Sequence, residues 1–175
     1  MKTLIEMEPE LRLAVLGPHM HDKTLPRHHL DHTVENVVRS VRAPVLLADR
    51  EYAEPRRFAV AFDGSLTGRK MIQMVANSPL LRELTSFVVM ASEGTPQANA
   101  QADWARTTLG QGGFSPEVAI IDGDPEEVLQ AHIKEHQVDL LVMGAYGHSR
   151  IRELIVGSTT TTMLRTSEVP VLILR

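Results

Sequence analysis

The chain has 175 residues, of which 43% are hydrophobic, and this is enough for one complete domain with a buried core. Its net charge of -4 leaves no basic excess, which argues against general binding to nucleic acid or to an anionic membrane. The absence of cysteine excludes disulfides, thiol nucleophiles and cysteine-ligated zinc. Acidic residues near Met1, with no apolar run of about 18 residues, predict neither a secretory signal nor a membrane span, and we expect a cytoplasmic protein.

The first part of the chain repeats the last part. Leu13-Ala14-Val15-Leu16-Gly17 resembles Leu140-Leu141-Val142-Met143-Gly144, and Ala43-Pro44-Val45-Leu46-Leu47 resembles Val169-Pro170-Val171-Leu172-Ile173. The glycine and the proline are 27 positions apart in the first copy and 26 in the second, so the copies align with one inserted residue. This spacing indicates an internal repeat.

The first copy lacks the small residues of the second. Three positions differ in this way: Met20 stands opposite Gly147, Asp31 opposite Gly157 and His32 opposite Ser158. A strand, a helix and one more strand cannot bury both faces of a sheet alone. Residues 1–48 are therefore interpreted as the C-terminal half of a degenerate, truncated first domain. The charged, proline-containing residues 49–56 are a linker, and residues 57–175 form a complete domain.

Strands and helices alternate through this second domain. Its apolar runs predict five strands, at Phe58–Phe62, Leu84–Ala91, Glu117–Ile121, Val138–Met143 and Val169–Leu174. The segments between them predict four helices: one capped by Thr67 and stopped near Pro79, one over 94–110, one after Asp124, and one over Ser158–Thr166. Such alternation predicts a doubly wound, mostly parallel five-stranded sheet of the Rossmann-like α/β class.

The third helix has the clearest local signal. Asp124-Pro125-Glu126-Glu127 places a capping carboxylate, a first-turn proline and two acids at its start. Val128, Leu129, His132 and Ile133 then follow at the spacing of one buried face.

A pair of glycines and a Gly-Ser step border the last loop of the domain. Gly144 and Gly147 let the backbone leave a buried strand sharply, and Gly157 precedes a helix whose first amides could hold an anion. Ser158 and the N–H groups of Thr159 and Thr160 would form this positive helix terminus. Other polar side chains border the loop, namely His148, Arg150 and Arg152. Asp63 ends the first strand of the domain, and the carboxyl ends of parallel strands meet in one crevice.

These residues resemble the universal stress protein family. Its nucleotide-binding members carry Gly-x-x-Gly, nine residues, and then Gly-Ser or Gly-Thr, and Gly144, Gly147, Gly157 and Ser158 match that pattern. Asp63-Gly64-Ser65 is also similar to the family. The resemblance covers residues 57–175 as a whole domain and 1–48 as half of another, so it is to the tandem form. It implies a fold like that of the adenine nucleotide alpha hydrolases.

The resemblance also implies a bound adenine nucleotide, ATP. In that case Asp63 contacts the ribose or adenine side, and Val89, or Val88 if the register slips by one, lines the adenine. Gly144 and Gly147 close over the sugar and phosphates. Gly157 and Ser158 hold the terminal phosphates, through which Mg²⁺ or Mn²⁺ could bind.

Three functions stay open at this stage. The first is non-catalytic nucleotide binding in a stress response. The second is slow ATP hydrolysis, which would be weak because no Walker lysine is present. The third is a structural or interaction role, with dimers formed by the final strands 44–48 and 170–174, which could pair across a pseudo-twofold or between chains. Asp63 could simply start a helix, and the histidines between His19 and His32 are interpreted as a solvated remnant rather than a zinc site.

Overall fold

The computed structural model describes residues 10–17, 32–48, 53–145 and 158–175. Its elements are the strands β1 (Ala14–Leu16), β2 (Val45–Leu47), β3 (Arg57–Ala61), β4 (Thr85–Ala91), β5 (Glu117–Ile121), β6 (Leu140–Gly144) and β7 (Val171–Leu174), and the helices α2 (His32–Ser40), α3 (Leu66–Ala76), α4 (Pro96–Gln111), α5 (Pro125–Glu135) and α6 (Ser158–Thr166). Within these residues no helix combines the length and hydrophobicity needed to cross a membrane.

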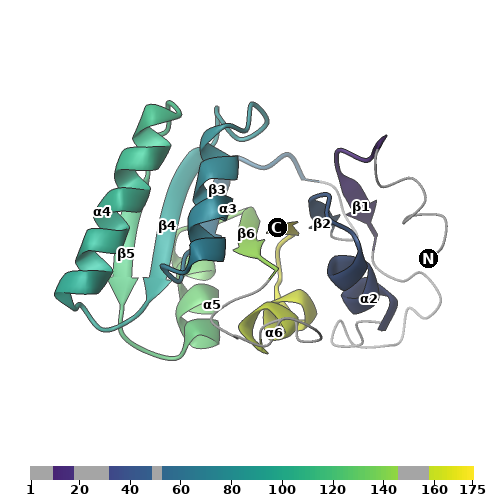
Figure 1. Cartoon of the computed structure of the whole chain (residues 1–175). Coiled ribbons are helices and arrows are strands. Elements are labelled where there is room, and N and C mark those ends of the chain that lie inside the picture. The colour runs from purple at the N-terminus through teal and green to yellow at the C-terminus, as the bar shows by residue number, and fades with distance from the viewer. Residues whose placement is uncertain (1–9, 18–31, 49–52, 146–157) are drawn as a thin grey trace.

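All seven strands lie in one sheet, in the order β1-β2-β7-β6-β3-β4-β5 (Figure 1). Every neighbouring pair is parallel except β2 and β7, which are antiparallel. The mostly parallel α/β sheet is confirmed, but the predicted count of five strands is wrong. In the described residues, β1 and β2 extend the sheet of residues 57–175, and no second domain is seen, because pairing with β7 joins them to it.

Strand β3 is the middle one of five neighbouring parallel strands, which follow the order β7-β6-β3-β4-β5. Its chain connection leads through α3 to β4 on one side, whereas β6, its other neighbour, is reached later through α5. The point where strand connections leave in opposite directions is where open α/β sheets bind ligands. The carboxyl ends of β3 and β6 therefore mark the edge of the sheet at which a site is expected.

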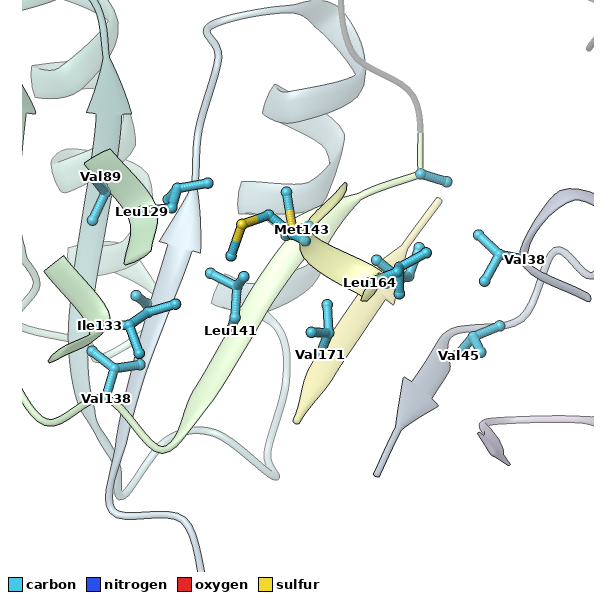
Figure 2. Close-up of a cluster of buried hydrophobic side chains, with 14 of the residues drawn as sticks. Val38, Val45, Val89, Leu129, Ile133, Val138, Leu141, Met143, Leu164 and Val171 are labelled. Atoms are coloured by element: carbon cyan, nitrogen blue, oxygen red, sulfur yellow. The ribbon is translucent and has the colours of Figure 1, made fainter. Parts of the chain in front are cut away.

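The core has two layers, one on each face of the sheet. Helices α2, α5 and α6 pack on the face drawn in Figure 2, and α3 and α4 pack on the opposite face. Strand β6 shows why both layers exist: Leu141 and Met143 enter the first layer, while Leu140 and Val142 enter the second. A continuous apolar run is what a strand covered on both faces requires.

Most helix ends match the sequence prediction. Asp124 caps α5 by accepting from the N–H groups of Glu126 at 2.9 Å and Glu127 at 3.3 Å, and α6 spans the predicted residues. The cap of α3 was predicted wrongly: the helix begins at Leu66, one residue before Thr67, and the hydroxyl of Ser65 accepts from the Gly68 N–H at 3.0 Å. Ser65 is favoured because its extended backbone ends the turn after β3.

The pairing of β2 with β7 has an internal symmetry. Leu46 lies opposite Leu172, Val45 opposite Ile173 and Leu47 opposite Val171. Because Val45 matches Val171 and Leu47 matches Ile173 in the repeat, the ladder maps onto itself around the two leucines. Helices α2 and α6 also begin at matching positions and have nine residues each. The final strands of the two copies thus pair within the chain across a pseudo-twofold axis.

Candidate functional site

The turn after β3 holds the Asp63 carboxylate in a fixed place. Asp63 Oδ1 accepts from the Ser65 N–H at 3.0 Å and from the Ser65 hydroxyl at 2.7 Å. Gly64 adopts a φ of 72°, which a side chain rarely tolerates. A Cβ on Gly68 would lie 2.5 Å from Asp63 Oδ1, so glycine there leaves room for the carboxylate. Asp63 therefore orders the start of α3, and its position at the strand end agrees with the prediction.

A side chain that the sequence did not single out supports this turn. Gln101 of α4 donates from Nε2 to the Gly64 carbonyl at 3.3 Å. A Cβ on Gly64 would overlap the Gln101 side chain, which shows how closely α4 approaches the turn. The sequence signal for Gln101 is its helical spacing from the alanines Ala98 and Ala105, which are buried in α4.

Next to this turn, the carboxyl edge of the sheet is formed by the end of β6, against which α6 begins. Gly144 is the last residue of β6, and its carbonyl accepts from the Thr160 hydroxyl at 3.1 Å. The next residue, Ala145, is buried and donates its N–H to the Leu174 carbonyl at 3.0 Å. Thr160 is itself only 5% exposed. The hydroxyl of Thr160 therefore holds the N-terminal turn of α6 against the carboxyl end of β6.

The helix starts at this edge of the sheet differ in their charge. Side-chain caps occupy first-turn amides of α3, α4 and α5, through Ser65, Thr95 and Asp124 respectively. Two more acids, Glu126 and Glu127, make the start of α5 unfavourable for an anion. The first turn of α6 carries no acidic residue. The first turns of α3 and α4 also lack acids, so charge separates α6 from α5 alone, and it leaves the α6 terminus compatible with a negatively charged group.

The structure brings only some of the predicted residues to this edge of the sheet. Asp63 and Gly144 lie at the ends of neighbouring strands, and Ser158 and the half-buried Thr159 begin α6. Other predicted site residues lie outside the described residues: Gly147, His148, Arg150 and Gly157. In the described residues no group of three or more histidine, aspartate and glutamate side chains gathers to hold a metal ion.

Among the predicted site residues that the structure describes, Val89 is the one whose side chain does not lie at this edge of the sheet. Its side chain is 1% exposed and lies in the same core layer as Leu129 of α5 (Figure 2), and its carbonyl accepts from the Phe62 N–H at 2.9 Å. Val88, the alternative, is fully buried on the opposite face. Strand β4 continues for two residues beyond Val89, so the residue at its carboxyl end is the partly buried Ala91.

Comparison with known proteins gives consistent matches. The sequence profile described as universal stress protein family matches residues 55–175. Universal stress protein Slr1230 of Synechocystis is 33% identical over 174 residues, which are 98% of this chain and 61% of that protein. Stress response protein NhaX of Bacillus subtilis is 31% identical over 98 residues, 55% of this chain and 57% of its own length.

Solved structures show the same fold. A universal stress protein from Archaeoglobus fulgidus superposes with a TM-score of 0.79 at 20% identity, over 99% of this chain and 66% of that one. A universal stress protein in complex with cAMP superposes with a TM-score of 0.60 at 23% identity, over 70% of this chain and 98% of that one. The chain thus spans about three fifths of the Synechocystis relative and about two thirds of the Archaeoglobus structure.

Proposed function

The chain belongs to the universal stress protein family, and we propose that it binds an adenine nucleotide, ATP, at the carboxyl edge of the sheet between β3 and β6. The observation that carries the proposal is the placement of the α6 N-terminus beside the end of β6 by the bond from Thr160 to Gly144. A helix start free of acids, facing the switch point of the sheet, suits a phosphate chain. A relative of this fold is described in complex with cAMP, which is also an adenine nucleotide.

Each part of the nucleotide has a proposed partner. The first-turn amides of α6, with Gly157, Ser158 and Thr159, hold the terminal phosphates, and the backbone at Gly144 and Gly147 closes over the sugar. Asp63 contacts the ribose or adenine. His148 and Arg150 flank the phosphates. Ala91 takes the adenine contact first assigned to Val89, because it ends β4.

A divalent ion in this proposal depends on the nucleotide. Since the described residues supply no cluster of three metal-binding side chains, Mg²⁺ or Mn²⁺ would be held mainly by phosphate oxygens. Binding without chemistry is the proposed activity.

Thermal unfolding with and without ATP tests this function. At a ligand concentration of 100 Kd, binding adds about 2.7 kcal/mol of stability, which raises Tm by about 5–10 °C in a domain of this size. Gly157→Asp places a carboxylate before the phosphate helix and should abolish the shift. Gly110→Asp is the charge-matched control, because Gly110 is exposed, has open space around it and lies at the other end of α4. Equal ATP-induced shifts in Tm in both variants would refute the site. Parallel titrations with cAMP and GTP define the preferred base and the preferred phosphate group.

We further propose that residues 1–48 are the C-terminal half of a degenerate tandem domain. The self-matching ladder around Leu46 and Leu172 supports this reading, as does the greater length of the Synechocystis relative. Because the first copy has Asp31 in place of Gly157, it should not hold phosphate. Isothermal titration should therefore give one nucleotide per chain, and a stoichiometry of two would contradict the assignment.

The homodimer predicted through the C-terminal strands stays a prediction. In the structure β7 already has β6 on one side and β2 on the other. A dimer through β7 would consequently require β2 to be exchanged between chains.

A further inference from the structure

Two imidazole rings stack at the C-terminal end of α5, away from the carboxyl edge of the sheet where this helix begins. His132 and His136 are four residues apart, and their ring centroids are 4.1 Å apart with an interplanar angle of 23°. Phe87 of β4 contacts both rings, at 5.5 Å from His132 and 5.0 Å from His136. His132 is 3% exposed, whereas His136 is half-buried at the end of the helix.

The His132 ring is held in the core without a hydrogen bond on its inner nitrogen. Nε2 is buried and has no partner in the described part of the chain. Such a ring is tolerated when neutral, but a proton on Nε2 would place an unsolvated charge beside a second imidazole. Burial, followed by the proximity of His136, lowers the pKa of His132 below its usual range, and the carboxylates of Glu117 and Glu135 only oppose this.

No charged group in the described residues forms a hydrogen bond with Nε2 of His132. Glu117, on β5, is exposed and lies opposite Phe87 in the sheet. Arg57, at the start of β3, donates from Nη1 to the His136 carbonyl at 2.9 Å, and Asp139 accepts from the Arg57 N–H at 2.9 Å. These contacts fix the backbone at the end of α5. They give the His132 ring no charged partner, so the ring can stay buried only while it is neutral.

Helix α5 is also coupled to the proposed phosphate helix. Gln130 of α5 donates from Nε2 to the Thr166 hydroxyl of α6 at 3.0 Å. Leu129 and Ile133 share one core layer with Leu164 (Figure 2). A shift of α5 that releases His132 would therefore disturb the packing under α6.

We propose that the stacked pair of His132 and His136 is an acid-sensitive switch, in which protonation of His132 expels its ring from the core, loosens the second half of α5 and so weakens ligand binding at α6. The last step rests on the proposed nucleotide-binding function. The direction of the pH dependence follows from linkage. The open state, with the His132 ring outside the core, binds the proton more readily than the closed state, so opening becomes more favourable as pH falls below about 6.5. One proton changes the opening equilibrium by up to about tenfold per pH unit.

Hydrogen exchange followed by mass spectrometry tests the switch without any nucleotide. After correction for intrinsic rates, peptides covering 128–136 of the wild type should lose about tenfold in protection between pH 7.5 and pH 5.5. His132→Phe, which keeps an aromatic ring against Phe87, should abolish this loss, and His132→Gln is a second non-titrating variant should phenylalanine not fit. An unchanged wild type, or an equal loss in the variants, would overturn the switch.

ATP affinity measured by calorimetry at the same two pH values tests the coupling to α6. The wild type should lose several-fold more affinity on acidification than His132→Phe, and this comparison removes the titration of ATP itself. An equal loss in both proteins would overturn the coupling. Failure to bind ATP at pH 7.5 would instead refute the proposed function and with it the coupling, while the exchange experiment would still decide whether α5 opens.

Discussion

The hydroxyl of Thr160 offers a sharp test of how the site is assembled. Thr160→Val replaces the hydroxyl by a methyl group of similar size, and both residues are β-branched, so helix propensity changes little. The substitution removes the donor to the Gly144 carbonyl at a position that is 5% exposed. Losing a buried hydrogen bond in this way should lower the free energy of unfolding by about 1–2 kcal/mol.

Urea denaturation measures this loss, and calorimetry with ATP measures its effect on the site. We expect Thr160→Val to weaken ATP binding because the N-terminus of α6 is no longer tied to β6. Thr160→Ser keeps the donor and should retain most of the affinity. Thr161→Val makes the same change at the next, partly buried position and is the matched control. Unfolding free energy and ATP affinity in Thr160→Val that equal those of the Thr161→Val control would refute the argument that this bond positions the helix.

Three further outcomes are expected. Ser65→Ala removes the cap of α3 and one partner of Asp63, and should cost about 1 kcal/mol in urea denaturation, whereas a neutral result would show that the cap is dispensable. Met163→Ala empties a fully buried position on the inner face of α6 and should cost about 2–5 kcal/mol by the same assay, and a loss below 1 kcal/mol would mean that the layer collapses to fill the space. If strand exchange forms the predicted dimer, light scattering should show a dimeric mass that Leu46→Asp converts to monomer, and a monomeric wild type at high concentration would contradict the dimer.

Local patterns predicted the elements of residues 57–175 because their signals lie within a few positions of one another. The acidic start of α5 and its inner face, including His132, are examples that the structure confirms. The count of seven strands was not predicted, because the pairing within the chain that joins Leu46 to Leu172 was only one of two arrangements left open for the final strands. No periodicity reports which strands become neighbours.

The sequence predicted where β6 ends and where α6 begins, but not the contacts that hold these two elements together. Glycine spacing identified Gly144 and the start of α6, whereas the partners of Gln101 and Thr160 are backbone carbonyls that only the folded chain brings near. Val89 was misplaced because an apolar strand covered on both faces gives no sign of where it ends or of which residue first meets solvent. Ala91 and its neighbours carry no motif that could have corrected this.

The antiparallel contact between β2 and β7 has a consequence for the order of folding. Strands β3 to β7 pair through contacts that residues 53–175 supply alone, but β1 and β2 join only after a long loop closes. Before that step, the outer edge of β7 presents unpaired backbone groups next to Leu172 and other apolar side chains. Strands β1 and β2 therefore protect the edge of β7 from pairing with another chain. We expect newly made protein to be most prone to aggregation before β2 pairs with β7.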